Sequence, residues 1–218
     1  MDWSKLHYTT KETATKLSAF LKQIKDSTEA EIRLGKASDA SFNASIDESD
    51  FQHLLSFLQQ FSQWKRQTPF ERSIDYFFKW RNRTIRSSVT TVHNQLKVDH
   101  VYKETTDSVL IKLSDIDVRI SLKEEVHVHE LPTFVNTDFV RIKERKSFYF
   151  NQWRYDFTKV WQGKSVSEAE QLSTPRYEVE VECLQPLDII RRENHVYLAV
   201  DFIQKIRSMF PTERIVLS

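Results

Sequence analysis

Glutamates on every second residue, in two short runs far apart in the chain, constrain the fold of this sequence more than any other feature. The runs are Glu29-Ala30-Glu31 and Glu178-Val179-Glu180-Val181-Glu182. If both are β-strands, each run of glutamates lies on one face, because successive side chains of a strand point to opposite faces. Like charges on one face repel, and carboxylate oxygens are suitable ligands for Mg²⁺ or Mn²⁺. The pattern predicts two strands and a divalent metal site, with a solvated face of two edge strands as the alternative.

Other segments repeat the same alternation with basic residues, and this favours the metal-site interpretation. Four further segments each have one apolar face and one polar or charged face: residues 84–89, 117–125, 139–145 and 153–158. In the same order, their polar or charged faces carry Arg86 and Ser88; Arg119, Ser121, Lys123 and Glu125; Arg141, Lys143 and Arg145; and Arg154, Asp156 and Thr158. A sheet of this kind can close into a barrel with the charged face inward and the apolar face packed outside. Ion pairs, water or a bound polyanion with metal must then satisfy the interior.

Four of these motifs, in this order, resemble a known family. Residues 29–33 read Glu-x-Glu-hydrophobic-basic, followed by Arg-x-Lys-x-Arg at 141–145, Arg-x-Asp-x-Thr at 154–158 and Glu-x-Glu-x-Glu at 178–182. Order and spacing are similar to those of the metal-dependent RNA 5′-triphosphatases of the triphosphate tunnel (CYTH-like) family, found in mRNA capping systems of fungi, protists and large DNA viruses. Arg119 with Glu125 resembles the central strand of that family, and Arg86 its earlier tunnel arginine. The resemblance spans roughly residues 28–183.

The resemblance implies an α+β fold, an antiparallel eight-stranded β-barrel tunnel with a charged interior, buttressed by helices. Apolar residues at helical spacing predict three of these helices, at 11–25, 48–64 and 196–209. Residues 162–175 are the most loop-like part of the chain. With two glycines in the whole sequence and no linker or repeat, we expect a single triphosphate tunnel domain over residues 1–218.

The resemblance also implies roles for the charged residues. Metal ligands are expected at Glu29, Glu31 and Glu182. Glu178 and Glu180 are expected to hold metal-bound water or a second metal and to orient the attacking water, whereas Glu125 either orients that water or pairs with Lys143. The expected substrate-binding residues are Arg33, Arg86, Arg119, Lys123, Arg141, Lys143, Arg145 and Arg154, with Lys143 and Arg145 also catalytic and Asp156 and Thr158 fixing the arginines and the ligand carboxylates.

Three functions agree with these residues. The first is an RNA 5′-triphosphatase that removes the γ-phosphate of nascent mRNA so that the diphosphate end can be capped. The second is a tunnel phosphohydrolase acting on tripolyphosphate, thiamine triphosphate or free nucleotides; such relatives have Glu-x-Glu-x-Lys where this chain has Arg33, which favours the capping branch. The third is a polyanion-binding barrel without activity, which five tunnel carboxylates disfavour because they repel a phosphate ligand in the absence of metal.

The rest of the sequence favours metal-assisted attack by water. Residues 163–165 read Gly-Lys-Ser, but the upstream glycine of a phosphate-binding loop is missing, and no serine has the local context of a nucleophile elbow. The formal net charge is only +1 although 29% of the residues are charged, so local clusters of charge matter more than the total.

We expect an intracellular protein that meets no membrane. The one cysteine, Cys183, excludes an intramolecular disulfide and fits a reducing compartment, and neither a signal peptide nor a membrane-spanning stretch is found. The nucleus, the cytoplasm or a viral cytoplasmic factory are the expected locations, and secretion is not expected. The expected partner is 5′-triphosphate RNA. The sequence leaves open whether a separate guanylyltransferase is a second partner and whether the chain is a monomer or a homodimer.

Overall fold

The structure is a computed structural model that describes residues 8–39, 41–92, 95–129, 136–211, 215 and 217. Ten strands are described: β1 Thr28–Ala37, β2 Phe42–Asn43, β3 Arg66–Gln67, β4 Glu71–Trp80, β5 Arg83–Val92, β6 Gln95–Lys112, β7 Asp117–His127, β8 Phe139–Phe150, β9 Trp153–Gly163 and β10 Arg176–Cys183. The described helices are α1 Tyr8–Leu21, α2 Glu48–Gln59, α3 Val166–Glu170, α4 Pro186–Arg192 and α5 His195–Met209.

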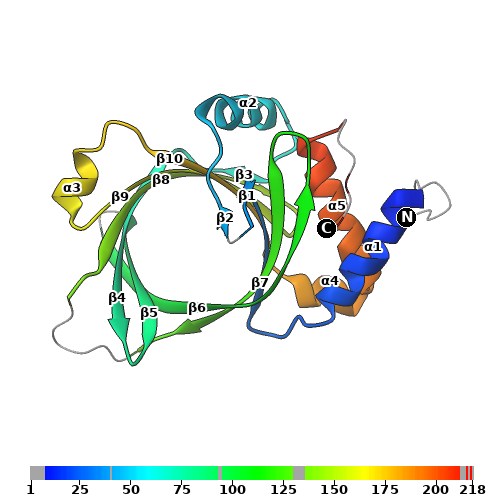
Figure 1. The fold of residues 1–218 in the computed structure, drawn as a ribbon, viewed down its shortest axis with the longest axis horizontal. Coiled ribbons are helices and arrows are strands. Elements are labelled where there is room, and N and C mark those ends of the chain that lie inside the picture. Colours follow the sequence, from blue (N-terminus) through cyan, green and yellow to red (C-terminus); the bar gives the residue numbers. More distant parts are fainter. Residues whose placement is uncertain are drawn as a thin grey trace.

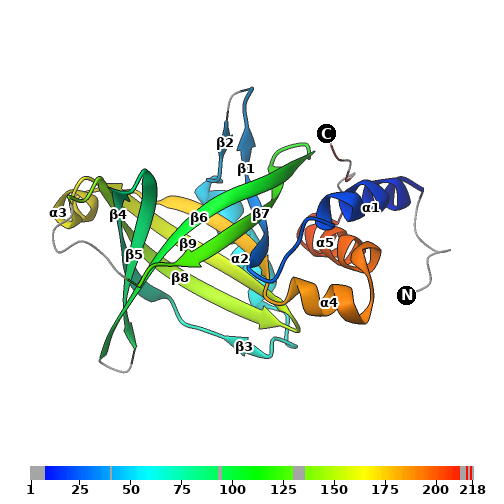
Figure 2. The same ribbon diagram turned by 90° about the horizontal axis from the view of Figure 1, so that it is seen from below.

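Eight of the strands close into an antiparallel barrel, as the sequence predicts. Their order is β10-β9-β8-β4-β5-β6-β7-β1, and pairing of β1 with β10 completes the circle. The two shortest strands lie outside this ring, with β2 paired to β1 and β3 paired to β8. Figure 1 looks down the barrel, and Figure 2 shows it from the side with α1, α4 and α5 gathered against one wall.

The alternation of each strand decides what lies inside and outside the barrel. Val179 and Val181 of β10 are buried on the outer face, between the glutamates that point inward. On β7, Ile120 and Leu122 are likewise fully buried. Because the inner face carries charge, the hydrophobic core of this protein lies outside the barrel rather than within it.

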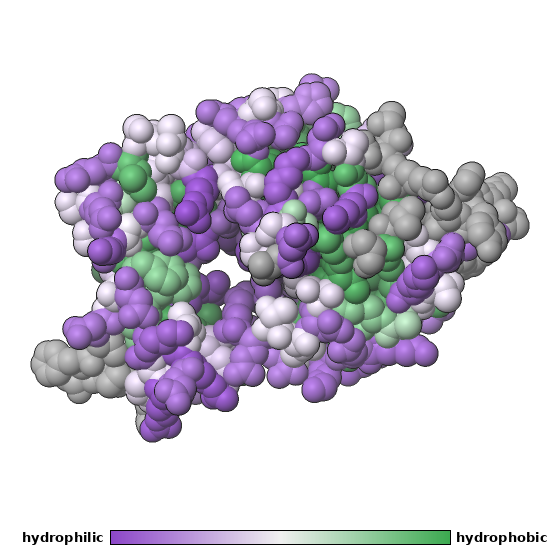
Figure 3. Space-filling view, in the orientation of Figure 1, coloured by the Kyte–Doolittle hydropathy of each residue, from purple (hydrophilic) through white to green (hydrophobic). Residues whose placement is uncertain are grey.

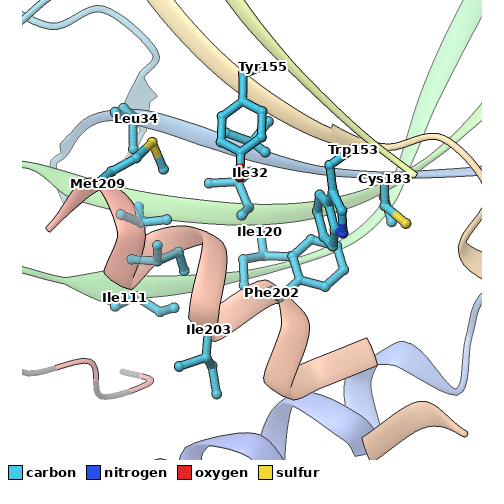
Figure 4. Close-up of a cluster of buried hydrophobic side chains, with 14 of the residues drawn as sticks. Ile32, Leu34, Ile111, Ile120, Trp153, Tyr155, Cys183, Phe202, Ile203 and Met209 are labelled. Atoms are coloured by element: carbon cyan, nitrogen blue, oxygen red, sulfur yellow. The ribbon is translucent and has the colours of Figure 1, made fainter. Parts of the chain in front are cut away.

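Helix α5 covers this outer face and supplies much of the core. Its Phe202 meets Trp153 of β9 edge to face, with ring centroids 4.8 Å apart, and Ile203 is buried in the same cluster (Figure 4). The indole nitrogen of Trp153 donates a hydrogen bond to Asp201 at 2.7 Å, which satisfies the only polar atom of that side chain. The helix therefore fixes the wall that carries β1, β7, β9 and β10 by burying large apolar side chains.

The structure corrects several predicted boundaries. The first and last predicted helices are α1 and α5, but the helix predicted over residues 48–64 ends at Gln59. Beyond that point Trp64 folds back, donating its indole N–H to the Leu58 carbonyl at 2.8 Å and packing on Phe148 of the barrel. The predicted loop 162–175 contains α3, whose first turn is capped by the Ser165 hydroxyl. In the described part of the chain, no helix is both long and apolar enough to cross a lipid bilayer.

Candidate active site

The interior of the barrel is hollow and polar, and Figure 3 looks into the opening. Two connected cavities occupy it: the central chamber, of about 380 Å³, and the vestibule, of about 620 Å³. Arg86, Lys143, Arg145 and Arg154 line both cavities and so mark where they join. The remaining lining residues of the central chamber are Glu29, Glu31, Arg33, Phe77, Thr84, Val101, Lys103, Glu125, Arg141, Glu180 and Glu182.

One side of the central chamber is formed by glutamates of β1 and β10, and we call Glu29, Glu31, Glu180 and Glu182 the carboxylate wall. The two strands are neighbours, and their register places Glu31 directly opposite Glu182. Charge repulsion between facing glutamates is costly unless cations compensate it. The register therefore assembles, from residues about 150 positions apart, the carboxylate group that the two sequence motifs predict.

Basic side chains compensate the carboxylate wall only in part. Lys103 of β6 pairs with Glu29 at 2.5 Å, and Lys123 pairs with Glu31. The Arg33 guanidinium bridges Glu31 and Glu180, at 2.7 Å to each. Although burial opposes ionisation, Arg33 and Arg145 hold the pKa of Glu180 well below its usual range. Three of the four carboxylates thus have cations at hydrogen-bonding distance on this side of the chamber.

Glu182 differs in the origin of its partner: among the described residues it pairs with Arg154 of β9, at 2.6 Å, and Arg154 also pairs with Asp156. Burial and the nearby Glu29 carboxylate raise the pKa of Glu182 to about 7 despite Arg154. Because burial raises this pKa and Arg154 compensates the shift only in part, a further cation would stabilise the charged form of Glu182, which is a reason to look for a cation ligand here.

The opposite side of the chamber is basic, and we call Arg86, Arg141, Lys143, Arg145 and Arg154 the cationic wall. Three of these residues alternate along β8 and face inward, as predicted. Burial, together with the neighbouring Arg145 and Arg141, lowers the pKa of Lys143 to about 8, and its ion pair with Asp75 offsets the shift only partly. Positive charge packed this densely favours a bound anion.

A buried carboxylate behind the cationic wall fixes two of its arginines. Asp156 of β9 is 1% exposed; it accepts hydrogen bonds from Arg154 Nε at 2.9 Å and from the Ser147 hydroxyl at 2.6 Å, and pairs with Arg145 at 3.1 Å. Thr158 accepts a further hydrogen bond from Arg145 Nε at 3.2 Å. Asp156 and Thr158 thus contact the arginines that they are expected to fix, and their role in fixing them for a substrate stays a prediction.

Three predicted residues, Arg119, Lys123 and Glu178, do not line the central chamber but contact residues near it, whereas Glu125 does line it. Glu178 pairs with Arg141, and Lys123 with Glu31. Arg119 stands in register beside Arg33, with its guanidinium 4.5 Å from the centre of the Phe42 ring. Of the two alternatives for Glu125, pairing with Lys143 is wrong: Glu125 pairs with Lys103 at 2.8 Å and approaches Arg86 at 3.5 Å.

Sequence reasoning missed two residues of the site, Asp75 of β4 and Lys103 of β6, because it missed both strands. Asp75 binds Lys143 of the cationic wall, and Lys103 binds Glu29 and Glu125. The available signal was weak. An isolated aspartate in the otherwise apolar run Ile74-Asp75-Tyr76 marks an inward position only once the barrel is known.

The carboxylate wall fits a hard divalent cation, although the described residues contain no ready-made group of three acidic, histidine or cysteine ligands. The donors are glutamate oxygens, which Mg²⁺ and Mn²⁺ prefer, and a cation would stabilise the charged form of Glu182, whose pKa burial and the Glu29 carboxylate raise. Lys103 and Lys123 now make contacts to Glu29 and Glu31 that an ion would share.

Comparison with known proteins supports this geometry. The family model for the mRNA capping enzyme, beta chain, matches residues 19–209. Among solved structures, Schizosaccharomyces pombe Pct1 RNA triphosphatase aligns with a TM-score of 0.72 at 19% identity, covering 96% of both chains. The structure of Pct1 in complex with the Spt5 CTD aligns with a TM-score of 0.73 at 19% identity, covering 94% of both chains.

The Mimivirus capping enzyme triphosphatase aligns with a TM-score of 0.56 at 15% identity, covering 87% of this chain and 97% of that one. At these identities the likeness to Pct1 and to the Mimivirus enzyme shows the fold. No curated protein sequence matches the chain.

Proposed function

The chain belongs to the family of the mRNA capping enzyme beta chain, the RNA triphosphatases, and from this premise we propose that its tunnel hydrolyses the γ-phosphate from triphosphate-ended RNA with the help of Mg²⁺ or Mn²⁺. The observation that carries the proposal is the pair of oppositely charged walls facing each other across one chamber. A triphosphate bound together with a divalent cation presents both signs of charge and so complements both walls.

Glu29, Glu31 and Glu182 are the residues that would hold the ion. Their carboxylates come from adjacent strands, and burial together with Glu29 raises the pKa of Glu182, so a cation there would stabilise its ionised form. When bound, the ion would supply stabilisation of the negative charge on the phosphate oxygens.

The cationic wall would bind the triphosphate and stabilise charge that grows on its oxygens. Phosphoryl transfer needs little beyond positioning and electrostatic stabilisation, and arginines held in place by buried carboxylates provide both. Asp156 keeps Arg145 and Arg154 in place before substrate arrives. Arg33, Arg119 and Lys123 would extend the positive surface on the other side of the chamber.

Two acidic residues are positioned to orient the attacking water. The low pKa of Glu180 keeps it ionised, so it can accept a hydrogen bond from water at neutral pH. Glu125 lies in the same chamber, held by Lys103. We assign Glu178 to support of Arg141, its partner in the structure, in addition to any contact with water.

A phosphate-release assay tests the proposal. The purified protein, with Mg²⁺ or Mn²⁺, is given triphosphate-ended RNA, tripolyphosphate or ATP, and orthophosphate is measured by malachite green. We expect release from the RNA, with a higher kcat/KM than from tripolyphosphate or ATP. Turnover of tripolyphosphate alone would support the second family activity instead, and binding without turnover would support a polyanion-binding barrel.

The product of this reaction points to a partner. A diphosphate RNA end is the substrate that a guanylyltransferase consumes, so we propose a separate guanylyltransferase as the next enzyme, in the nucleus or cytoplasm. The structure of Pct1 with the Spt5 CTD makes a peptide of that kind a second candidate partner. Co-purification of either with the tagged protein tests these proposals.

A further inference from the structure

We propose that the vestibule binds the first nucleotides of the RNA, with Tyr149 as a stacking platform for a base and Arg66 and Lys97 as contacts for the phosphodiester backbone. The inference rests on the proposed function and names the mouth through which the RNA chain leaves the central chamber. It also distinguishes RNA from tripolyphosphate, which has no bases and no chain to place there.

The vestibule is continuous with the site of reaction. It joins the central chamber along Arg86, Lys143, Arg145 and Arg154, so a triphosphate held by the cationic wall already borders it. Tyr149 stands in register opposite Arg154, next to this junction. The end of β5, the beginning of β6 and the whole of β3 lie on this same side of the barrel (Figure 2).

The vestibule is lined by fewer carboxylates than the central chamber, as a site for an RNA backbone requires. Each cavity is lined by seven arginines and lysines, but the central chamber has five carboxylates and the vestibule only two, Glu71 and Asp75. Asp75 is already paired with Lys143. Arg72 pairs with Glu170, and the four cations shared with the central chamber also have carboxylate partners. The positive charge that remains comes from Arg66 and Lys97, against the single carboxylate of Glu71, and it suits the single negative charge of each phosphodiester.

Two cations of the vestibule have no acidic partner. Among the described residues, no carboxylate lies within ion-pair distance of Arg66 or Lys97, and both side chains are exposed. The Arg66 guanidinium instead sits 5.1 Å from the centre of the Tyr149 ring. An arginine beside an aromatic ring is a common combination for single-stranded nucleic acid, since the ring stacks on a base while the cation meets the backbone.

Neutral hydroxyl groups complete the lining. Ser73, Ser88 and Thr90 face the vestibule from β4 and β5, where they can donate to and accept from ribose hydroxyls. The central chamber has one such residue, Thr84. The two cavities therefore differ in chemistry: charged groups for the triphosphate in one, and mixed hydroxyl, basic and aromatic groups in the other.

The opposite end of the barrel carries a similar pair, Arg119 over the Phe42 ring. Burial and the neighbouring Arg33 lower the pKa of Arg119, whereas the carboxylates of Glu31 and Glu180 oppose the shift. Carboxylates thus act on Arg119, whereas no carboxylate of the described residues pairs with Arg66, so charge favours the vestibule over this second mouth.

A double variant, Arg66→Ala with Tyr149→Leu, tests the proposal. With Mg²⁺ present, kcat/KM is measured on a triphosphate-ended RNA of about ten nucleotides and on tripolyphosphate. We expect about a tenfold or larger loss on RNA, from the lost base stacking and backbone contact, with turnover of tripolyphosphate within about twofold of wild type. The unchanged tripolyphosphate turnover also shows that the variant is folded.

The barrel offers a matched control. Arg83 lies 4.3 Å over the ring of Tyr102, the same pair of residue types, but these positions alternate with the tunnel-lining Thr84 and Lys103 and so face outward. The variant Arg83→Ala with Tyr102→Leu should behave as wild type on both substrates.

Several results would overturn the inference. For the variant Arg66→Ala with Tyr149→Leu, they are an unchanged kcat/KM on RNA, or an equal loss of kcat/KM on RNA and on tripolyphosphate. The same RNA-selective loss in the control Arg83→Ala with Tyr102→Leu would also overturn it. So would an RNA-selective loss in Phe42→Leu that Arg66→Ala with Tyr149→Leu does not show. Failure of the proposed function looks different, because the wild-type protein itself would then release no phosphate from RNA, and both proposals would fall together.

Discussion

The carboxylate wall and the cationic wall are built by the same strand pattern but are left with opposite electrostatic deficits. On the first, burial and Glu29 raise the pKa of Glu182 to about 7; on the second, burial and neighbouring arginines lower the pKa of Lys143 to about 8. On each wall one side chain, Glu182 or Lys143, is thus held against its own ionisation, and that side chain gains from a ligand of the other sign. The comparison indicates that the tunnel is arranged for a metal ion and a polyanion together.

The energy that holds such charges in place comes from outside the barrel. Fully buried residues such as Ile32, Ile120 and Phe202 pack between the outer face of the strands and α5. Burying a large apolar side chain stabilises the folded state by about 1.5 to 3 kcal/mol. The apolar outer core can thus offset the cost of an interior with charges that are not fully paired.

Removal of divalent metal should have the largest effect. Without a cation, the carboxylate wall and the triphosphate repel each other, so excess EDTA should abolish phosphate release, and added Mg²⁺ or Mn²⁺ should restore it. Orthophosphate release from triphosphate-ended RNA is the measurement. Full turnover in EDTA would remove the metal from the account altogether.

Loss of one glutamate of the carboxylate wall should be nearly as severe. Glu31→Ala and Glu182→Ala should each lower kcat by on the order of a hundredfold or more, because a missing ligand unsettles the ion. Glu124→Gln is the control, since Glu124 alternates with Lys123 and Glu125 along β7 and, among the described residues, forms an ion pair with Lys25 alone, at 3.4 Å. Near-wild-type rates for either alanine variant would rule out that ligand, and a loss of folding would indicate a structural ion-pair role.

Substitutions in the cationic wall should come next. Lys143→Ala and Arg145→Ala should each lower kcat/KM by an amount that corresponds to a loss of about 2 to 4 kcal/mol in transition-state stabilisation. Glu144 lies between them on β8, and its side chain borders an outer pocket with Ile142 and Trp161. Glu144→Gln should be nearly silent. If Glu144→Gln were crippling and Lys143→Ala harmless, the inward register of β8 would be wrong by one residue.

A smaller effect is expected from pH. Lys143 is protonated below its pKa of about 8 and neutral above it, so kcat/KM should fall as the pH rises through that value. If the positive charge of Lys143 is essential, kcat/KM should fall by about tenfold per pH unit on the alkaline side of the pH profile. Because arginine stays protonated, Lys143→Arg should keep activity to higher pH. If kcat/KM of Lys143→Arg falls at the same pH as that of the wild type, the titrating group is not Lys143.

The sequence predicts the inward-facing charges well where alternation is unbroken, and poorly where it is not. β1, β7, β8, β9 and β10 alternate cleanly, so both the barrel and most of its lining follow from period two. On β4, Tyr76, Phe77 and Phe78 form a continuous aromatic run, although Phe77 faces the chamber, and this hides the alternation around Asp75.

On β6 a register shift between Thr105 and Asp107 changes which residues point inward, so the position of Lys103 does not follow from a simple pattern. The pairing of Lys103 with Glu29 and Glu125 depends on barrel closure, which brings together strands far apart in sequence. Trp64 similarly continues the helical spacing of apolar residues in α2, so the sequence predicts a helix that reaches it. In the structure Trp64 packs on Phe148 and Tyr155 of the barrel instead, and the helix ends before it.

Binding of Mn²⁺ followed by electron paramagnetic resonance tests the division between the two walls most directly. Wild-type protein, Glu182→Gln and Lys143→Ala are each titrated with Mn²⁺ without substrate, and the free-ion signal gives the bound fraction. The account predicts that Glu182→Gln binds Mn²⁺ at least tenfold more weakly, as expected for a lost ligand contact, and that Lys143→Ala binds it as well as wild type or better. Equal binding by wild type and Glu182→Gln, or weakened binding in Lys143→Ala alone, would contradict it.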